Sequence, residues 1–279
     1  MPENEPVIKI RGLYKSFGSN KVLNGFDMDL YRGENTVILG KSGSGKSVLI
    51  KCIIGLIQPD SGSIEVLGQS VSALHNSTLD KMRMKVGFLF QSNALYDSMT
   101  VRENLEFPLR RHRLNVTKQE VNRLVEETLD SVGLPHTADM MPAELSGGMR
   151  KRIALARTLI LKPEIILYDE PTTGLDPITS REISNLMVQV QKKYNTSSII
   201  ISHDLNCVKI TSNRVVMLID GINYASDALN GVQASEDPKV REFFFFFLNE
   251  RYILQKFTFR RFCSTWPCFA GRSALSYRG

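Results

Sequence analysis

Cysteine, tryptophan and long apolar runs are scarce in this chain of 279 residues. Cys263 and Cys268 lie close together but have no second pair or histidines nearby, so we expect neither a disulfide scaffold nor a zinc site. No apolar run approaches the roughly 20 residues that a membrane-spanning helix requires. The first residues are acidic and contain two prolines, which does not fit a secretory signal. The composition therefore predicts a globular protein that is not embedded in a membrane.

Positive charge is nearly balanced over most of the chain. The formal net charge is +6, but residues 243–279 alone hold six basic residues and one acidic residue. Residues 1–242 are therefore close to neutral, and the overall charge is no argument for nucleic-acid binding. We expect no nucleic-acid partner.

Short apolar segments alternate with helical patterns along the chain. This alternation predicts an α/β fold with a mainly parallel sheet that is covered on both faces. Residues of about 95–160 interrupt the alternation and are mostly helical in pattern, which indicates a helical subdomain. The expected strands are 7–10, 22–30, 36–39, 63–67, 86–90, 164–168, 198–201 and 214–219, and the expected helices outside that subdomain are 46–56, 178–194 and 204–210.

A glycine-rich loop follows the apolar run at 36–39 and opens a predicted helix. Its sequence fits the pattern G-x-x-x-x-G-K-[ST]. Glycines let successive backbone N–H groups face a phosphate, and the helix N-terminus adds partial positive charge. Lys46 is placed to reach the β- and γ-phosphates, and Ser47 to offer its hydroxyl to Mg²⁺. The predicted nucleotide-binding residues here are Gly40, Lys41, Ser42, Gly43, Ser44, Gly45, Lys46, Ser47 and Val48.

Two adjacent carboxylates, Asp169 and Glu170, end the apolar strand predicted at 164–168. In a P-loop protein the first carboxylate holds Mg²⁺, directly or through water, so we expect Asp169 to be a metal ligand. Glu170 is then placed to polarise the attacking water. A buried strand seldom ends in two adjacent acids unless a cation lies nearby.

Three further features say little when each is taken alone. Leu145-Ser-Gly-Gly-Met149 precedes a basic amphipathic helix, and Ser146 is a good N-cap whose turn exposes backbone N–H groups to an anion. Gln91 follows the strand expected at 86–90. His203 follows the strand expected at 198–201, and a lone histidine there is more often structural than functional.

Taken in order, these motifs resemble the nucleotide-binding subunit of ATP-binding-cassette (ABC) transporters. The resemblance covers about residues 7–242 and includes Gly174-Leu-Asp176 and Ser202-His203-Asp204. It implies a P-loop NTPase fold of the ABC type over 7–242, with an N-terminal antiparallel β subdomain and a helical subdomain. It also implies an ATPase that uses ATP and Mg²⁺, works beside an integral membrane permease, and pairs with a second copy of itself as a homodimer, or with a related subunit.

The resemblance assigns roles to the matching residues. Phe17 resembles the aromatic side chain that stacks on adenine, and Gln91 the residue that contacts Mg²⁺ or water and reports to the membrane partner. Glu170 resembles the catalytic base, and His203 the switch that holds the γ-phosphate. The catalytic residues implied are Glu170, His203 and Gln91, and the metal ligands implied are Ser47, Gln91 and Asp169.

The remaining roles concern the interface between two cassettes. Ser146, Gly147 and Gly148 resemble the signature that binds the γ-phosphate of the opposite subunit, and Asp176 the residue that crosses the dimer interface. Met149 stands where the family usually has glutamine, and methionine cannot donate an amide hydrogen bond. Because the serine and glycines remain, we expect two copies still to enclose ATP.

Several short stretches are similar to one branch of the family, the Mla-type, MCE-associated lipid-transport ATPases, and Met149 is itself a feature of that branch. These stretches are 90–95, 107–110, 141–149, 176–179 and 237–243. The similarity implies that ATP turnover drives phospholipid movement between membranes with a permease and an MCE-domain lipid-binding protein. It also implies a peripheral location at the cytoplasmic face of the inner membrane.

Two alternative functions stay open. The first is an ATPase that serves an importer of a small polar solute, with the same chemistry and a different permease. The second is a cassette without a membrane partner that acts on nucleic acid or ribosomes. The second would carry a coiled-coil insertion or two cassettes in one chain, and the sequence contains neither.

Residues 243–279 form an atypical tail that is rich in phenylalanine and basic residues. Residues 245–279 resemble nothing in the family, and five phenylalanines in a row require a uracil-rich message. A slip or sequencing error there would shift the reading frame, so we expect the native C-terminus near Phe244. The alternatives are a disordered tail or a basic aromatic segment at a membrane surface. Resequencing the gene across the phenylalanine run distinguishes these hypotheses, because an uninterrupted reading frame to Gly279 would exclude a frame shift.

Overall fold

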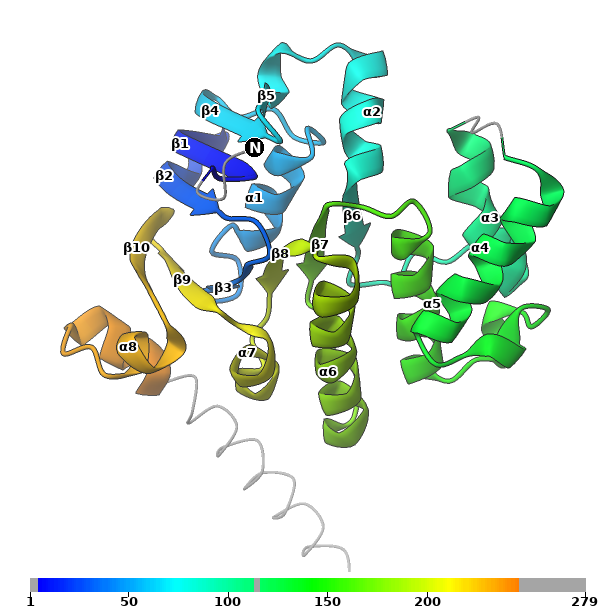
Figure 1. Cartoon of the computed structure of the whole chain (residues 1–279). Coiled ribbons are helices and arrows are strands. Elements are labelled where there is room, and N and C mark those ends of the chain that lie inside the picture. The colour runs from blue at the N-terminus through cyan, green and yellow to red at the C-terminus, as the bar shows by residue number, and fades with distance from the viewer. Residues whose placement is uncertain (1–4, 113–115, 246–279) are drawn as a thin grey trace, which may run out of the picture. The chain divides into compact units, whose positions relative to one another are not determined.

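The computed structural model describes residues 5–112 and 116–245. The chain divides into two compact units, Met1–Val232 and Gln233–Gly279. None of the helices in the described ranges is long and apolar enough to cross a membrane. Among the described residues, the first unit contains both β-sheets and nearly all of the helices, so it holds the parts of the fold that position the predicted site (Figure 1).

A four-stranded antiparallel sheet lies at the start of the chain. Its strand order is β2-β1-β4-β5. In β1, Ile8, Ile10 and Leu13 are fully buried, while their neighbours Arg11 and Tyr14 are exposed. The strands are β1 (Ile8–Phe17), β2 (Asn20–Leu30), β4 (Ser61–Val66) and β5 (Gln69–Ser70). This sheet is the antiparallel β region that the family resemblance implies.

A six-stranded sheet of order β10-β9-β3-β8-β7-β6 forms the centre of the first unit. All of its neighbouring strands are parallel except the β9–β10 hairpin. Every residue of β3, β7 and β8 is buried, as expected for parallel strands covered on both faces. The strands are β3 (Asn35–Leu39), β6 (Val86–Leu89), β7 (Ile165–Asp169), β8 (Ser197–Ile201), β9 (Arg214–Ile219) and β10 (Ile222–Asp227). The predicted α/β fold with a mainly parallel sheet is therefore confirmed.

Helix α1 (Lys46–Ile53) lies between the two sheets (Figure 1). Its Leu49 and Ile53 belong to the same buried apolar cluster as Ile10 of β1 and Leu167 of β7. Helices α6 (Pro177–Tyr194) and α7 (Leu205–Thr211) pack together beside the parallel sheet. Burying both faces of this sheet removes much apolar surface from water, which stabilises the sheet whose strand ends carry the predicted site.

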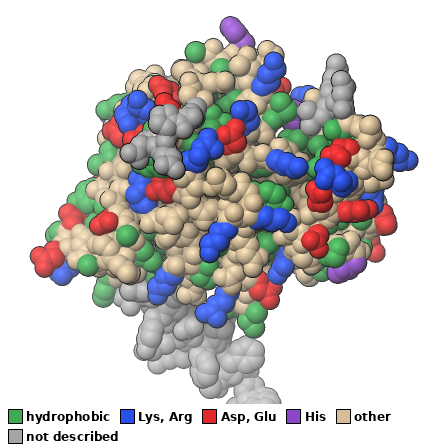
Figure 2. All heavy atoms as spheres, in the orientation of Figure 1, with side chains coloured by type: hydrophobic (Ala, Val, Ile, Leu, Met, Phe, Trp, Pro, Cys, Tyr) green, Lys and Arg blue, Asp and Glu red, His purple; other side chains and the backbone are tan. Residues whose placement is uncertain are grey.

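A group of helices projects to one side of the sheet (Figure 1). It consists of α3 (Val101–Arg111), α4 (Lys118–Ser131) and α5 (Gly147–Leu159). Thr100 and Glu103 form a capping box that starts α3. Figure 2 shows acidic and basic side chains next to one another over this group. The three helices lie within the helical segment predicted at about 95–160, and the domain bounds 7–242 stay a prediction.

The sequence patterns missed α2 (Asn76–Lys85) and β10 in the first unit. Met82 is the one buried residue of α2, so this helix has no apolar stripe to reveal it. No residue of β10 is fully buried, since it lies at the edge of the sheet. The expected helix at 46–56 is also shorter, because Gly55 adopts a left-handed φ of +66° and ends it.

The second unit is described only as far as residue 245. The first unit ends in the short helix α8 (Leu229–Gln233), whose last residue already belongs to the second unit. Residues 238–245 are helical, and the Asp237 carboxylate accepts hydrogen bonds from the backbone N–H groups of Lys239 and Val240 at 2.8 and 3.2 Å. Residues 246–279 lie outside the described residues, so the hypotheses about the tail stay predictions.

Candidate nucleotide site

The glycine-rich loop joins β3 to α1, as the sequence predicts. Gly45 is the N-cap of α1 and has a left-handed φ of +100°. A Cβ at Gly45 would lie only 2.5 Å from Cγ1 of Val22, so no larger residue fits there without a shift. The first turn of α1 contains no acidic residue to neutralise the partial positive charge of the helix N-terminus. The loop backbone is therefore shaped and charged for an anion.

Lys46 points back into this loop. Its Nζ donates to the carbonyl oxygens of Gly40 at 2.8 Å and Lys41 at 3.0 Å, and only 9% of the residue is exposed. Burial lowers the pKa of Lys46, and the carboxylates of Asp169 and Glu170 oppose that shift. The Ser44 hydroxyl is buried and has no hydrogen-bond partner among the described residues. A phosphate oxygen would satisfy this hydroxyl, so the loop fits a nucleotide phosphate.

Ser47 and Asp169 meet at the start of α1 and the end of β7. Ser47 Oγ donates to Oδ1 of Asp169 at 3.1 Å. Asp169 is 8% exposed, and burial raises the pKa of its carboxyl group, while the hydrogen bond from Ser47 opposes the shift. A hydroxyl and a carboxylate are oxygen ligands of the kind Mg²⁺ prefers, with phosphates and waters as its other ligands. The donor set therefore fits Mg²⁺.

Glu170 and His203 form a close pair beside these residues. His203 Nδ1 lies 2.6 Å from Oε2 of Glu170, and Thr173 Oγ1 donates to the same oxygen at 3.1 Å. Glu170 has a left-handed φ of +52°, and its backbone N–H donates to the carbonyl of Ile201 at 3.0 Å. The hydrogen bond to Glu170 raises the pKa of His203, and burial opposes this. The two residues meet because they follow β7 and β8, which are parallel neighbours.

A second cluster brings the Ser146 turn against the segment that carries Asp176. Ser146 caps α5 by accepting a hydrogen bond from the backbone N–H of Met149 at 3.2 Å. A Cβ on Gly148 would lie 2.6 Å from Cγ2 of Thr179, so these two segments of the chain approach closely there. The Asp176 carboxylate caps α6 through the backbone N–H groups of Ile178 and Thr179 at 3.0 and 3.1 Å.

Two further predicted residues, Phe17 and Gln91, form no side-chain hydrogen bond with either cluster among the described residues. Phe17 ends β1 on the antiparallel sheet, is 50% exposed, and has Lys15 Nζ 5.3 Å from its ring centroid. Gln91 is exposed in a turn after β6. The remaining predicted loop residues are the exposed Lys41, Ser42 and Gly43 and the half-buried Val48. The exposed ring of Phe17 leaves an aromatic face open for stacking.

Lys151 is a residue that the sequence analysis missed. It lies in α5, is 2% exposed, and its Nζ donates to the backbone carbonyl of Gln91 at 2.9 Å. Burial lowers the pKa of Lys151, and the carboxylates of Asp169 and Glu170 oppose this shift. The signal was present in the sequence, because Lys151 precedes Leu155 and Leu159 by four and eight positions on the buried face of the helix.

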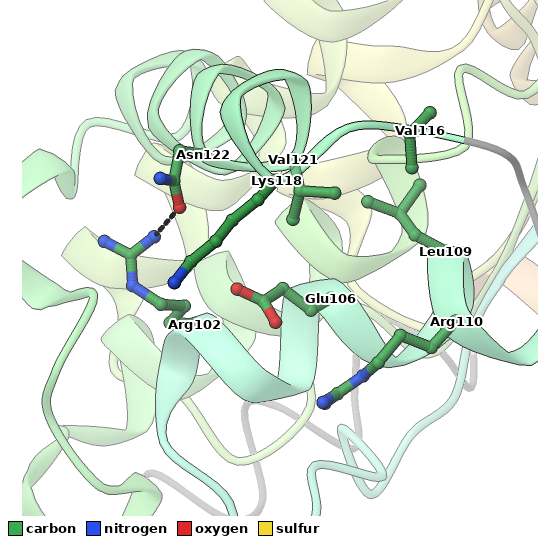
Figure 3. A pocket seen from close by; sticks show the side chains of 8 residues that line it. All are labelled: Arg102, Glu106, Leu109, Arg110, Val116, Lys118, Val121 and Asn122. Atoms are coloured by element: carbon green, nitrogen blue, oxygen red, sulfur yellow. Dashed lines mark hydrogen bonds between the residues drawn. The ribbon is translucent and has the colours of Figure 1, made fainter.

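A separate hollow of about 570 Å³ lies on α3 and α4 (Figure 3). Arg102 Nη1 donates to Asn122 Oδ1 across it at 3.2 Å. Its lining is Arg102, Glu106, Leu109, Arg110, Val116, Lys118, Val121 and Asn122. No predicted nucleotide-site residue lines this hollow, so it is distinct from the glycine-rich loop.

The central sheet, the glycine-rich loop before α1 and the acidic end of β7 define a P-loop nucleotide-binding protein. The sequence pattern of the ABC transporter family matches residues 23–173, and the chain belongs to this family. It is the ATP-binding subunit of an ABC transporter, an ATPase whose ATP hydrolysis is coupled to transport. Cassettes of this family act as dimers with membrane permease subunits. The resemblance inferred from the motifs is therefore confirmed.

Several known proteins are similar over most of the chain. The "Probable ribonucleotide transport ATP-binding protein mkl" of Mycobacterium leprae is 38% identical over 88% of this chain and 70% of its own length. The "Intermembrane phospholipid transport system ATP-binding protein MlaF" of Haemophilus influenzae is 34% identical over 86% of this chain and 90% of its own. The "Methionine import ATP-binding protein MetN" of Clostridium tetani is 37% identical over 77% of this chain and 67% of its own length.

Solved structures show the same fold. The structure of cbiO1 from Clostridium perfringens, part of the ABC transporter complex cbiONQ, has a TM-score of 0.77 and 29% identity, over 84% of this chain and 92% of that one. A dimeric post-hydrolysis structure of the ATP-binding cassette MJ0796, bound to ADP and Pi, has a TM-score of 0.72 and 30% identity, over 80% of this chain and 98% of that one. The ABC-type ATPase fold is therefore shared.

Proposed function

We propose that the glycine-rich loop binds the phosphates of ATP and that Ser47 and Asp169 hold Mg²⁺ with them. The buried, unpartnered hydroxyl of Ser44 and the buried ammonium of Lys46 support the phosphate site. When bound, Mg²⁺ neutralises charge that develops on the phosphate oxygens. Phe17 supplies the exposed ring for adenine, and Gln91 is the ligand that we expect to complete the metal site from the turn after β6.

We propose that Glu170 is the general base for the attacking water. The close contact with His203 and the hydrogen bond from Thr173 fix the direction of its carboxylate. A fixed carboxylate can accept a proton from water without reorganising, which is where general-base catalysis gains its rate. His203 is also placed, by its exposed ring, to donate a hydrogen bond to the γ-phosphate.

In this proposal, each ATP is bound by residues from two copies of the chain. The first turn of α5, which follows Ser146, contains no acidic residue to offset the partial positive charge of its backbone N–H groups. This turn packs against the Asp176 segment of its own chain. We propose that Ser146, Gly147 and Gly148 bind the γ-phosphate of ATP held by a second copy and that Asp176 lies at the interface between copies. Two complete sites then require two chains.

We propose that the transported substrate is a phospholipid that moves between membranes. The observation that carries this proposal is the similarity to MlaF, which extends over 90% of that protein's length. The Met149 variant of the signature and the stretch at 141–149 support the same branch. The partners in this proposal are an integral permease and an MCE-domain lipid-binding protein. The chain would then lie peripherally at the cytoplasmic face of the inner membrane.

A second candidate is an importer of a small polar solute. The similarities to mkl and MetN, whose names specify ribonucleotide transport and methionine import, favour this alternative. The chemistry at Glu170 would be the same in both cases, because the permease selects the substrate.

Purification of the chain from native membranes in mild detergent separates the two candidates. Mass spectrometry of the purified proteins and lipids should identify a permease, an MCE-domain protein and bound phospholipid. Recovery of a solute permease with a soluble binding protein would instead contradict lipid transport and leave the ATP chemistry unchanged.

A further inference from the structure

Lys151 joins two elements that the proposed mechanism treats separately. It belongs to α5, which begins directly after Ser146, and its ammonium group donates a hydrogen bond to the backbone carbonyl of Gln91. Ser146 is the N-cap of α5, and Lys151 follows it by five residues, which separates them by about 7.5 Å along the helix axis. The hydrogen bonds of an α-helix hold such neighbours as a rigid body, so displacement of the Ser146 turn would also displace Gln91.

The burial of Lys151 requires an explanation. Taking an ammonium group out of water is costly unless it is paired, and among the described residues Lys151 has the Gln91 carbonyl as its one hydrogen-bond acceptor. An apolar residue of similar volume is often neutral or stabilising at such a position. Packing alone therefore does not account for a lysine here, whereas a specific link to Gln91 does.

We propose that Lys151 is a positioning residue that ties the backbone of Gln91 to the helix of the Ser146 turn. Binding of the opposite subunit's γ-phosphate at Ser146 then moves Gln91, which approaches the metal site of its own chain. This inference rests on the proposed roles of Ser146 and Gln91. Lys151 itself touches neither nucleotide nor metal in the proposal, so its effect is on turnover and not on ATP affinity.

The test uses the full chain and three variants. Lys151→Met removes the donor and keeps an unbranched side chain that is one atom shorter, and Lys151→Arg restores a charged donor. Lys81→Met makes the same chemical change at an exposed lysine of α2 and serves as the matched control. Two properties are measured for each chain: steady-state ATP hydrolysis, and hydrogen–deuterium exchange of peptides that cover 38–48 and 88–96, with and without ATP.

Lys151→Met should lower kcat about tenfold, the order expected from loss of one charge-assisted hydrogen bond, with KM for ATP within about twofold of wild type. ATP should still slow exchange at 38–48 but no longer at 88–96. Lys151→Arg should restore at least part of both losses, and Lys81→Met should resemble wild type. If Lys151 had only a structural role, Lys151→Met would raise exchange throughout α5 and weaken the protection by ATP in both peptides.

Several results would overturn the inference. Lys151→Met with wild-type kcat and wild-type exchange at 88–96 would exclude the link, and so would an equal defect in Lys151→Arg. If Lys151→Met does not fold, Lys151→Leu, which also lacks a donor and favours a helix, is judged by the same two measurements and the same criteria. The inference fails separately from the proposed function, because a wild-type chain that neither binds nor hydrolyses ATP would refute the nucleotide site itself.

Discussion

Substitution of Glu170 by glutamine tests the centre of the proposed mechanism. Glutamine has almost the same shape as glutamate, and its Oε1 can still accept the hydrogen bond that Thr173 Oγ1 donates at 3.1 Å. The left-handed backbone at this position and the hydrogen bond from its N–H to Ile201 do not depend on the carboxylate. The variant should therefore fold normally and lack only the negative charge and the basic oxygen.

The expected loss of turnover is large because one function is removed completely. A positioned general base contributes about 10²–10⁴-fold, which corresponds to roughly 3–5 kcal/mol of barrier. We expect Glu170→Gln to lower kcat by at least about 100-fold while the dissociation constant for ATP stays within about threefold. Phosphate release under saturating ATP measures the first quantity, and titration with a fluorescent ATP analogue measures the second.

A matched control separates loss of the base from a general loss of charge. Glu182 of α6 also forms an ion pair, with Arg152 at 2.8 Å, but it lies outside the predicted site. Glu182→Gln should hydrolyse ATP at nearly the wild-type rate. Turnover by Glu170→Gln within tenfold of wild type would show that this carboxylate is not the base.

Three further changes test the surrounding residues. Lys46→Ala should weaken ATP binding about 100-fold, since it removes charged hydrogen bonds worth roughly 3 kcal/mol, and isothermal titration that found undiminished affinity would refute the loop assignment. Asp169→Asn should raise the Mg²⁺ concentration for half-maximal hydrolysis at least about tenfold. The pKa of Asp169 is raised in the folded state, so its ionised form destabilises the fold above about pH 4. Asp169→Asn should therefore unfold at a higher temperature than wild type at neutral pH without nucleotide. An unchanged Mg²⁺ requirement would contradict the metal role. The pKa of His203 is raised by Glu170, so its contribution to stability is complete below about pH 6.5 and disappears as the pH rises through the raised value. The difference in melting temperature between wild type and His203→Ala should accordingly be larger at about pH 6 than at about pH 9, and a pH-independent difference would argue against the ion pair.

Most strands and the turns that carry the motifs can be predicted from the sequence because their signals are local. The continuous apolar runs of β3, β7 and β8 indicate strands buried on both faces, and the structure confirms them. Helix α2 and strand β10 could not be predicted, because their exposed surfaces leave no apolar pattern. The role of Lys151 was not predicted either, because a lysine within a basic run is usually solvated.

The chemistry of each local element follows from the amino-acid sequence alone. The glycine-rich loop and the caps at Ser146 and Asp176 depend on backbone dihedrals and hydrogen bonds within a few residues, so short motifs specify them. Which of these elements meet depends on how the strands and helices pack in three dimensions. Glu170 pairs with His203 because β7 lies beside β8, and Gln91 is held by Lys151 because α5 packs against β6. Strand order and helix packing follow from burial over the whole chain, which no local pattern encodes.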